Sequence, residues 1–126
     1  MTNDRKFCKC DLCGNFISFI HNAGVPVMCC GKKMTELTPN TTDAAVEKHV
    51  PVAVHEECDL TVTVGSVAHP MTEEHLIEWI VVADGERTQR IALAAGQEPK
   101  AEFCLCGENA TVYAYCNLHG LWETKI

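Results

Sequence analysis

The stretch HLIEWIVVADGERTQRIALAAG, residues 75–96, carries the clearest indication of the fold. The stretch reads as two strands around Asp84-Gly85, a dipeptide typical of tight turns between antiparallel strands. The same period of two recurs in LTVTV (60–64) and in ATVYAYC (110–116). Several short strands at close spacing, with almost no helical periodicity, predict an antiparallel β-sandwich or barrel.

One segment departs from this pattern. TTDAAVEKH (41–49) could form a helical turn with Thr42 or Asp43 as its cap, and a loop is an equal alternative. Neither outcome changes the prediction of a mainly β chain.

The chain's 126 residues suit one ordinary domain, or a moderate domain with a small appendage. The first 37 residues hold five of the nine cysteines and few large apolar side chains, so this segment needs a metal, a disulfide or a partner to fold. A polar run, TPNTTD, then connects it to the β domain. The predicted division is 1–37, linker 38–43, and 44–126.

Composition and charge narrow the class of protein. No run approaches the roughly 20 apolar residues of a membrane helix, and the opening MTNDRKFCKC has no apolar stretch behind it. We therefore expect no membrane span and no secretory signal, and predict a cytoplasmic location. The formal net charge of −7 argues against nucleic acid as a partner. An anionic substrate would need a local positive centre to overcome this field.

The cysteines indicate metal binding. Nine cysteines in a chain without an export signal are not expected to form a disulfide framework, because the cytosol keeps thiols reduced. Cys10 and Cys13 have the C-x-x-C spacing followed by glycine, and fifteen residues later comes the adjacent pair Cys29-Cys30. Four thiolates suit zinc or a single iron, and the adjacent pair should distort the tetrahedron. Cys8 is expected to be a surplus, unligated thiol.

A second candidate site involves histidines. EKHVP (47–51), AHPMTEEHLIEWI (68–80) and CNLHGLW (116–122) place four imidazoles and one thiol near predicted strand ends. A single histidine is more often a surface residue than a ligand, but these could converge at one rim of a sandwich. Five donors are one too many for tetrahedral zinc. The donors are His49, His69, His75, Cys116 and His119.

With these motifs in view, the sequence resembles desulfoferrodoxin, the two-iron class of superoxide reductase, over essentially its whole length. The motifs that carry the resemblance are K-C-x-x-C-G (9–14), Cys29-Cys30, T-x-D-A-A-x-E-K-H-V-P (41–51), V-G-S-V-A-H-P-M with H-x-I-E-W-I (64–80), and Y-C-N-x-H-G-x-W (115–122). Ala114 stands where the family pattern has glutamate.

The resemblance implies a fold and two iron centres. The fold would be a desulforedoxin-like N-terminal domain followed by an immunoglobulin-like, seven-stranded sandwich. Two non-haem irons per chain are implied, the second with a vacant sixth position opposite its axial cysteine. The ligands would be Cys10, Cys13, Cys29 and Cys30 for the N-terminal iron, and equatorial His49, His69, His75 and His119 with axial Cys116 for the catalytic iron.

The resemblance also implies an activity and partners. The family reduces superoxide to hydrogen peroxide without making dioxygen, is homodimeric, and takes electrons from a rubredoxin-like donor, with the four-cysteine iron as an accessory electron site. Lys48, next to His49, is the natural group to focus an anionic substrate. Glu47 resembles the glutamate that occupies the sixth position of the oxidised iron. The backbone amides of Leu118 and His119 are predicted to bond the Cys116 sulfur.

Two other functions fit the residues. One is a rubredoxin-type electron-transfer protein whose sandwich only docks partners, and the other is a zinc-stapled interaction module without redox activity. Extra thiols depart from the family pattern and have no predicted role. They are Cys8, Cys58, Cys104 and Cys106.

Overall fold

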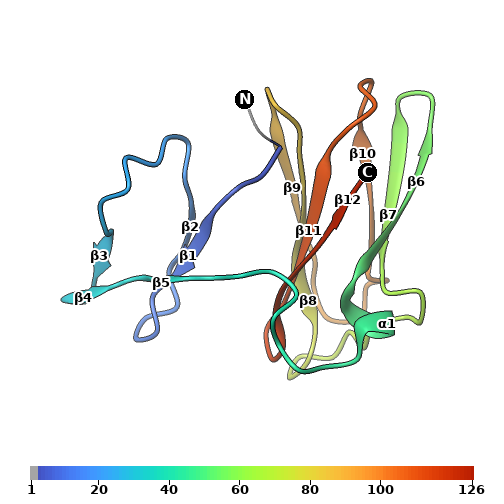
Figure 1. Cartoon of the computed structure of the whole chain (residues 1–126). Helices are drawn as coiled ribbons and strands as arrows, with labels where there is room; N and C mark the ends of the chain where they lie inside the picture. The colour runs from blue at the N-terminus through green and yellow to red at the C-terminus, as the bar shows by residue number, and fades with distance from the viewer. Residues whose placement is uncertain (1–2) are drawn as a thin grey trace.

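The computed structural model describes residues 3–126 and shows a β-sandwich with a smaller N-terminal unit beside it (Figure 1). The sandwich strands are β6 (Pro51–Glu56), β7 (Asp59–Val64), β8 (Ile77–Ala83), β9 (Thr88–Ala92), β10 (Lys100–Cys104), β11 (Thr111–Cys116) and β12 (Gly120–Lys125). They form a three-stranded sheet of order β10-β7-β6 and a four-stranded sheet of order β12-β11-β8-β9, antiparallel throughout. The predicted fold class is confirmed.

The sandwich core follows the alternation predicted for residues 60–64. Leu60, Val62 and Val64 of β7 are fully buried, while the residues between them are half-buried. They share one core cluster with Ile80 of β8 and Val112 of β11, which belong to the opposite sheet. Each such side chain stabilises the fold by about 1.5–3 kcal/mol when it leaves water.

Strand β11 confirms the strand predicted for 110–116, and every residue from Thr111 to Cys116 is buried. Val112 and Ala114 point into the sandwich core. Tyr113 and Tyr115 point to the other face, where the N-terminal unit covers them. A strand covered on both faces is apolar on both, so the sequence pattern did not indicate the second covered face.

The N-terminal unit consists of very short strands. These are β1 (Phe7–Lys9), β2 (Phe16–Ser18) and β5 (Thr35–Glu36) in one sheet of order β2-β1-β5, and a hairpin of β3 (Met28–Cys29) and β4 (Lys32–Lys33). Phe7 packs with ring centroids 5.1 Å from both Trp79 and Tyr113, and Phe16 lies 4.8 Å from Tyr115. This aromatic contact fixes the unit against the four-stranded sheet.

The turn predicted at Asp84-Gly85 is longer than a two-residue turn. The β8–β9 connection runs from Asp84 to Arg87. The Asp84 carboxylate accepts hydrogen bonds from the amides of Glu86 at 2.8 Å and Arg87 at 2.7 Å. Gly85 is not among the residues with positive φ. Because the aspartate side chain closes the turn, a left-handed glycine is not required.

A single helical turn, α1 (Val46–His49), follows the connecting segment. Ala45 occupies the N-cap position, and no side chain caps the helix. The expectation of Thr42 or Asp43 as the cap was therefore wrong, because the helix begins three or four residues later. α1 nevertheless brings His49 to one end of the sandwich (Figure 1).

The connecting segment is tied to β12. The Asn40 amide donates to the Leu121 carbonyl at 3.0 Å, and its side chain exchanges hydrogen bonds with the backbone of Glu123. The boundaries 1–37, 38–43 and 44–126 stay a prediction, and the first two residues lie outside the described part of the chain.

Cys58 and Cys106 form a disulfide, and the other seven cysteines are free, so one bond exists although no disulfide framework was expected. The pairing of β10 with β7 places Cys104 opposite Asp59, so the end of β10 lies beside the β6–β7 turn. Sequence spacing could not indicate this proximity, because 48 residues separate the two sulfurs.

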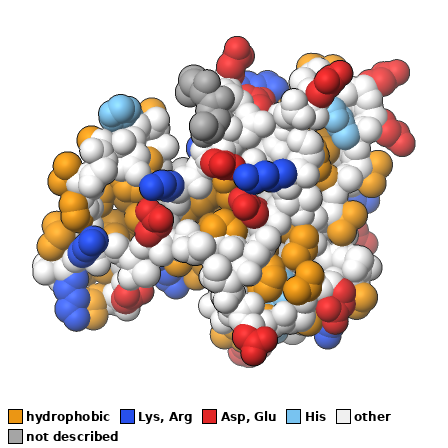
Figure 2. Space-filling model, viewed as in Figure 1, with side chains coloured by type: hydrophobic (Ala, Val, Ile, Leu, Met, Phe, Trp, Pro, Cys, Tyr) orange, Lys and Arg blue, Asp and Glu red, His pale blue; other side chains and the backbone are white. Residues whose placement is uncertain are grey.

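The surface of the N-terminal unit carries several exposed apolar side chains, which Figure 2 shows at the left of the molecule. They are Leu12, Ile20, Val25 and Met28, each more than 60% exposed. Exposed apolar side chains on one small unit favour contact with another molecule. In the described residues, no helix has the length and hydropathy needed to cross a bilayer.

Candidate metal centres

The first candidate centre lies in the N-terminal unit. The sulfurs of its four cysteines all lie within 4.8 Å of one another. Cys13 and Cys29 have their sulfurs 3.6 Å apart, and the Asn15 side-chain amide donates to the Cys29 sulfur at 3.5 Å. The structure therefore brings together the set predicted from spacing, Cys10, Cys13, Cys29 and Cys30.

Local backbone conformation explains how adjacent cysteines join one group. Cys30 has a φ of 54°, in the left-handed region that few non-glycine residues adopt, and Gly31 follows with a φ of 73°. This turn redirects the Cys30 side chain toward the side that Cys29 faces. Gly14, with a φ of 81°, closes the C-x-x-C loop by donating its amide to the Cys10 carbonyl at 3.0 Å.

The electrostatics of the group favour a cation. Hydrogen bonds from the amides of Cys13 and Leu12 lower the pKa of Cys10 to about 6. The neighbouring thiols, Cys13 first, raise the pKa of Cys30 to about 12. One thiolate thus forms readily, but further negative charge in so small a volume needs a positive ion. Cys8 lies buried in β1, outside the group of four.

The second candidate centre lies at the end of the sandwich that α1 covers. His49 ends α1, His69 and His75 lie in the loop between β7 and β8, Cys116 ends β11, and His119 lies in the turn before β12. One donor atom each of His49, His75, Cys116 and His119 lies within 4.8 Å of all the others. The remaining donor, His69, has its Nε2 atom 3.1 Å from Nε2 of His49 and its ring 4.6 Å from that of His75.

Hydrogen bonds decide which nitrogens face the centre. Nδ1 of His49 donates to the Ala45 carbonyl, and Nδ1 of His69 donates to the Pro70 carbonyl, both at 2.7 Å. In these neutral rings Nε2 then carries a lone pair. His119 instead presents Nδ1, which is 3.1 Å from Nε2 of His49.

This arrangement fits a metal ion. Two Nε2 lone pairs face each other at 3.1 Å, which is repulsive unless a cation lies between them. Nε2 of His75 is buried and has no hydrogen-bond partner, as expected for an atom whose partner is a metal. Imidazole and thiolate donors suit iron, and five of them exceed the four of structural zinc.

Burial keeps the imidazoles neutral and therefore able to ligate. It lowers the pKa of His49 and His75, and lowers that of His69 to about 4. Cys116 is fully buried, which raises the pKa of its thiol. Hydrogen bonds from the amides of Leu118 and His119 act in the opposite direction, as the Cys-x-x-His turn predicted. A bound cation would complete the ionisation of this thiol.

Comparison with known proteins identifies the family. The family profile described as desulfoferrodoxin matches residues 41–125. A desulfoferrodoxin homolog from Archaeoglobus fulgidus is 45% identical over 124 residues, which cover 98% of this chain and 99% of that one. The chain belongs to the desulfoferrodoxin family. The desulfoferrodoxin of Nitratidesulfovibrio vulgaris is 44% identical over 126 residues, 99% of each chain.

Solved structures agree with this desulfoferrodoxin assignment. The superoxide reductase from Treponema pallidum superposes with a TM-score of 0.79 at 33% identity, covering 96% of this chain and 98% of that one. The one-iron superoxide reductase from Giardia intestinalis has a TM-score of 0.56 at 33% identity and covers 64% of this chain but 97% of its own. The Treponema protein therefore matches nearly the whole of this chain, whereas the Giardia protein matches about two thirds of it.

Side chains around the second centre hold its ligands in place in this desulfoferrodoxin-family chain. The Trp122 ring stacks on His49 with centroids 5.0 Å apart, and its Nε1 donates to the His119 carbonyl at 3.0 Å.

Asn117 is a positioning residue that the sequence analysis missed. Its Oδ1 accepts from the Leu76 amide at 3.0 Å, and its Nδ2 donates to the Glu74 carbonyl at 2.9 Å. These bonds tie the loop that carries His75 to the turn that carries His119. In the sequence, the only indication of this role is that Asn117 lies between two predicted ligands, Cys116 and His119.

Lys48 and Glu47 lie on α1 and are both exposed. The positive charge of Lys48 contributes to lowering the pKa of His49 and His75, so it acts on the side of the centre where these rings lie. Gly65 has a φ of 84°, and a Cβ there would stand 2.7 Å from the Glu47 carbonyl oxygen. The β7–β8 loop can therefore pack closely on α1 only because residue 65 has no side chain.

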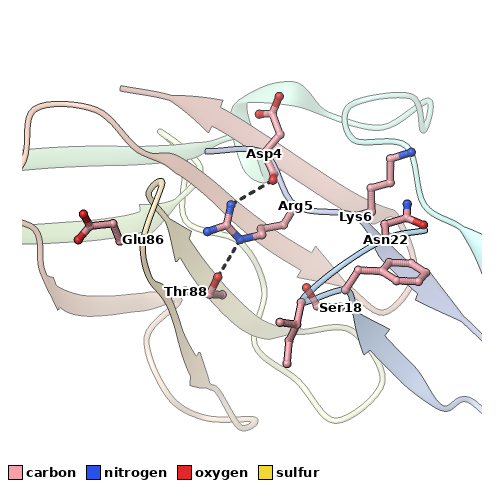
Figure 3. A pocket seen from close by; sticks show the side chains of 9 residues that line it. Asp4, Arg5, Lys6, Ser18, Asn22, Glu86 and Thr88 are labelled. Atoms are coloured by element: carbon pink, nitrogen blue, oxygen red, sulfur yellow. Dashed lines mark hydrogen bonds between the residues drawn. The ribbon is translucent and has the colours of Figure 1, made fainter. Parts of the chain in front are cut away.

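A surface groove of about 780 Å³ lies elsewhere, between the N-terminal unit and the β8–β9 turn (Figure 3). Arg5 crosses it, donating from Nε to the Thr88 hydroxyl at 2.8 Å and from a guanidinium NH₂ to the Asp84 carbonyl at 2.5 Å. The groove contains none of the candidate ligands. Its polar side chains serve the contact between the two units.

Proposed function

We propose that this chain is a superoxide reductase, which adds one electron and two protons to superoxide to give hydrogen peroxide. The observation that carries the proposal is the group of four imidazoles and one thiol, whose donor atoms gather beside an exposed lysine. His49, His69, His75, His119 and Cys116 would hold the iron. When bound, ferrous iron supplies the single electron.

The protein's own residues would control access to this centre. His49 and His69 are 2% and 3% exposed, whereas His75 and His119 are half-buried, so solvent reaches the group from the side of the latter pair. Cys116 lies beneath, fully buried. A small anion can therefore approach from the histidine side while the sulfur stays out of water.

Charge would bring superoxide to this side. The chain carries a net charge of −7, which repels an anion in general. The ammonium group of Lys48 opposes this repulsion next to His49, and water around it supplies the protons. We propose Glu47, its neighbour, as the carboxylate donor to the oxidised iron, because ferric iron is a hard ion that suits oxygen ligands.

The four-cysteine group of the first centre would hold the other iron and serve as an accessory electron site. A rubredoxin-like protein is the proposed donor, in a cytoplasmic setting. The exposed apolar side chains on the N-terminal unit, Ile20 and Met28 among them, support the proposed homodimer.

The test is to purify the metal-loaded protein anaerobically and measure iron, visible absorption and product stoichiometry. A superoxide reductase yields one hydrogen peroxide for every superoxide and no dioxygen, whereas a dismutase yields one for every two. Two irons per chain and this stoichiometry are expected. Iron at the four cysteines alone, without superoxide consumption, would favour the electron-transfer function. A colourless zinc protein would favour the interaction module.

A further inference from the structure

Three cysteines outside both metal centres gather at one place on the sandwich. Cys58 lies in the β6–β7 turn and is bonded to Cys106, which follows β10. The sulfur of Cys104, the last residue of β10, lies 4.0 Å from that of Cys106. All three residues are exposed. We call them the cysteine trio.

The cysteine trio lies at the end of the sandwich opposite α1, as Figure 1 shows for the β6–β7 turn and the connection after β10. Strand β6 runs between the two ends, and its six residues span about 17 Å. The trio is therefore separated from the four-histidine group and has no part in the function proposed for it.

Leu105 anchors the trio from inside. Its side chain is 1% exposed, its amide donates to the Cys58 carbonyl at 2.9 Å, and its carbonyl accepts from Nε2 of His55 at 2.6 Å. Successive side chains in extended backbone point to opposite faces. Burial of Leu105 therefore sends its two neighbours, Cys104 and Cys106, to the same solvent side as Cys58.

Cys104 is held from the other sheet. The Gln89 side chain donates to the Cys104 carbonyl at 2.7 Å and accepts from its amide at 3.4 Å. The Arg87 guanidinium donates to the same carbonyl at 3.2 Å. The free thiol thus stays beside the disulfide.

An exposed disulfide with a third thiol in reach has the components of thiol–disulfide exchange, in which a thiolate attacks one sulfur of the bond. Exposed disulfides are also the ones that external thiols reduce readily. We propose that the cysteine trio is a thiol–disulfide exchange site that accepts two electrons from a dithiol reductant, independently of both metal centres.

Two steps define the site. In the internal step the Cys104 thiolate attacks the Cys106 sulfur, a Cys104–Cys106 bond forms, and the bond to Cys58 breaks. Cys58 leaves as a thiolate and takes up the proton that Cys104 released, so no net oxidation occurs. In the external step a dithiol attacks the disulfide and closes its own ring, which transfers two electrons and two protons to the protein and oxidises the dithiol.

The test uses the metal-loaded protein purified without reductant. Free thiols are trapped with N-ethylmaleimide after an acid quench and located by tandem mass spectrometry. In the wild type, label is expected on Cys104 in some molecules and on Cys58 in others. Dithiothreitol should raise the labelled thiols of the trio from one to three while the iron content stays the same.

Two variants isolate the internal step. C104S should keep the Cys58–Cys106 bond and lose all label on Cys58. C58S, treated with glutathione disulfide as the two-electron oxidant, should form a Cys104–Cys106 bond and release two reduced glutathione molecules. Label confined to Cys104 in the wild type would overturn the proposal, as would three free thiols in the protein before dithiothreitol is added. If C58S does not fold, the label on Cys58 in the wild type and its loss in C104S still test the internal step.

Discussion

The two candidate metal centres differ in how the chain assembles them. The four cysteines lie within residues 10–30, and turns at Gly14 and Cys30 bring them together. The four histidines and one cysteine extend over residues 49–119 and meet only because α1, one loop and two strand ends converge. Local backbone conformation is sufficient for the first centre, whereas the second needs the complete sandwich.

The centres also differ in exposure. Cys13 and Cys30 are exposed, so an iron there would lie near the surface, where an electron donor can approach. At the second centre His49, His69 and Cys116 are buried. Under the proposed function, the exposed centre would receive electrons and the buried centre would admit only a small substrate.

The largest effect is expected from His49→Ala. The second centre loses the nitrogen that lies 3.1 Å from donors of both His69 and His119. Superoxide reduction should fall by at least about 100-fold, since changes merely around a metal site already cost 10–100-fold. Iron content should fall from two per chain to one. His21→Ala, at an exposed loop histidine, is the control and should change neither value.

Cys13→Ser tests whether the centres are separable. Loss of one of four thiolates should remove the N-terminal iron and its visible absorption, because such small units depend on their metal. Activity with an artificial reductant should remain, since the second centre keeps all its ligands. Cys8→Ser, which removes a thiol outside the group, is the control. If activity disappears with the N-terminal iron, the two centres are not independent.

Phe7→Ala tests the packing that joins the two regions. Phe7 is 4% exposed and contacts Trp79 and Tyr113. Its truncation should lower the free energy of unfolding by about 3–5 kcal/mol, as for other buried phenylalanines. Denaturant unfolding of the metal-loaded protein measures this. Ile20→Ala, at a fully exposed position, should have almost no effect. An equally small effect of Phe7→Ala would mean that the units stabilise themselves separately.

Lys48→Ala should slow the second-order reaction with superoxide roughly tenfold and reduce its dependence on ionic strength, because one focusing charge is lost. Lys125→Ala is the control. It removes one positive charge at the end of β12 that is remote from His119, where Lys125 pairs with Asp4 at 3.4 Å. Pulse radiolysis over a range of salt concentrations distinguishes the two variants. Equal effects would assign the result to net charge and remove Lys48 from the mechanism.

Glu47→Ala should have the smallest effect on rate. If Glu47 ligates the oxidised iron, the variant should reduce superoxide as fast as the wild type, but the visible band of its oxidised form should shift. Glu74→Ala provides an exposed carboxylate in the β7–β8 loop as the control. An unchanged oxidised spectrum in Glu47→Ala would reject this ligand.

Much of the fold could be predicted because it depends on local patterns. The alternation at residues 60–64 indicated which side chains of β7 enter the core, and C-x-x-C-G indicated a thiolate site. The alternation at residues 110–116 indicated a strand, which the structure confirms, but it did not indicate that both faces of this strand are buried. Tyr113 and Tyr115 are buried by a unit that precedes them by about a hundred residues, so the residues themselves carry no sign of it.

The amino-acid sequence by itself determined the strands, the four-cysteine group and the candidate donors, because spacing and periodicity act through neighbouring residues. Only the tertiary structure decided that five distant donors meet, which nitrogen each ring presents, and that Asn117 links two of their loops. It also decided the Cys58–Cys106 bond. Contacts between remote segments depend on how sheets pair and pack, and no local pattern encodes that geometry.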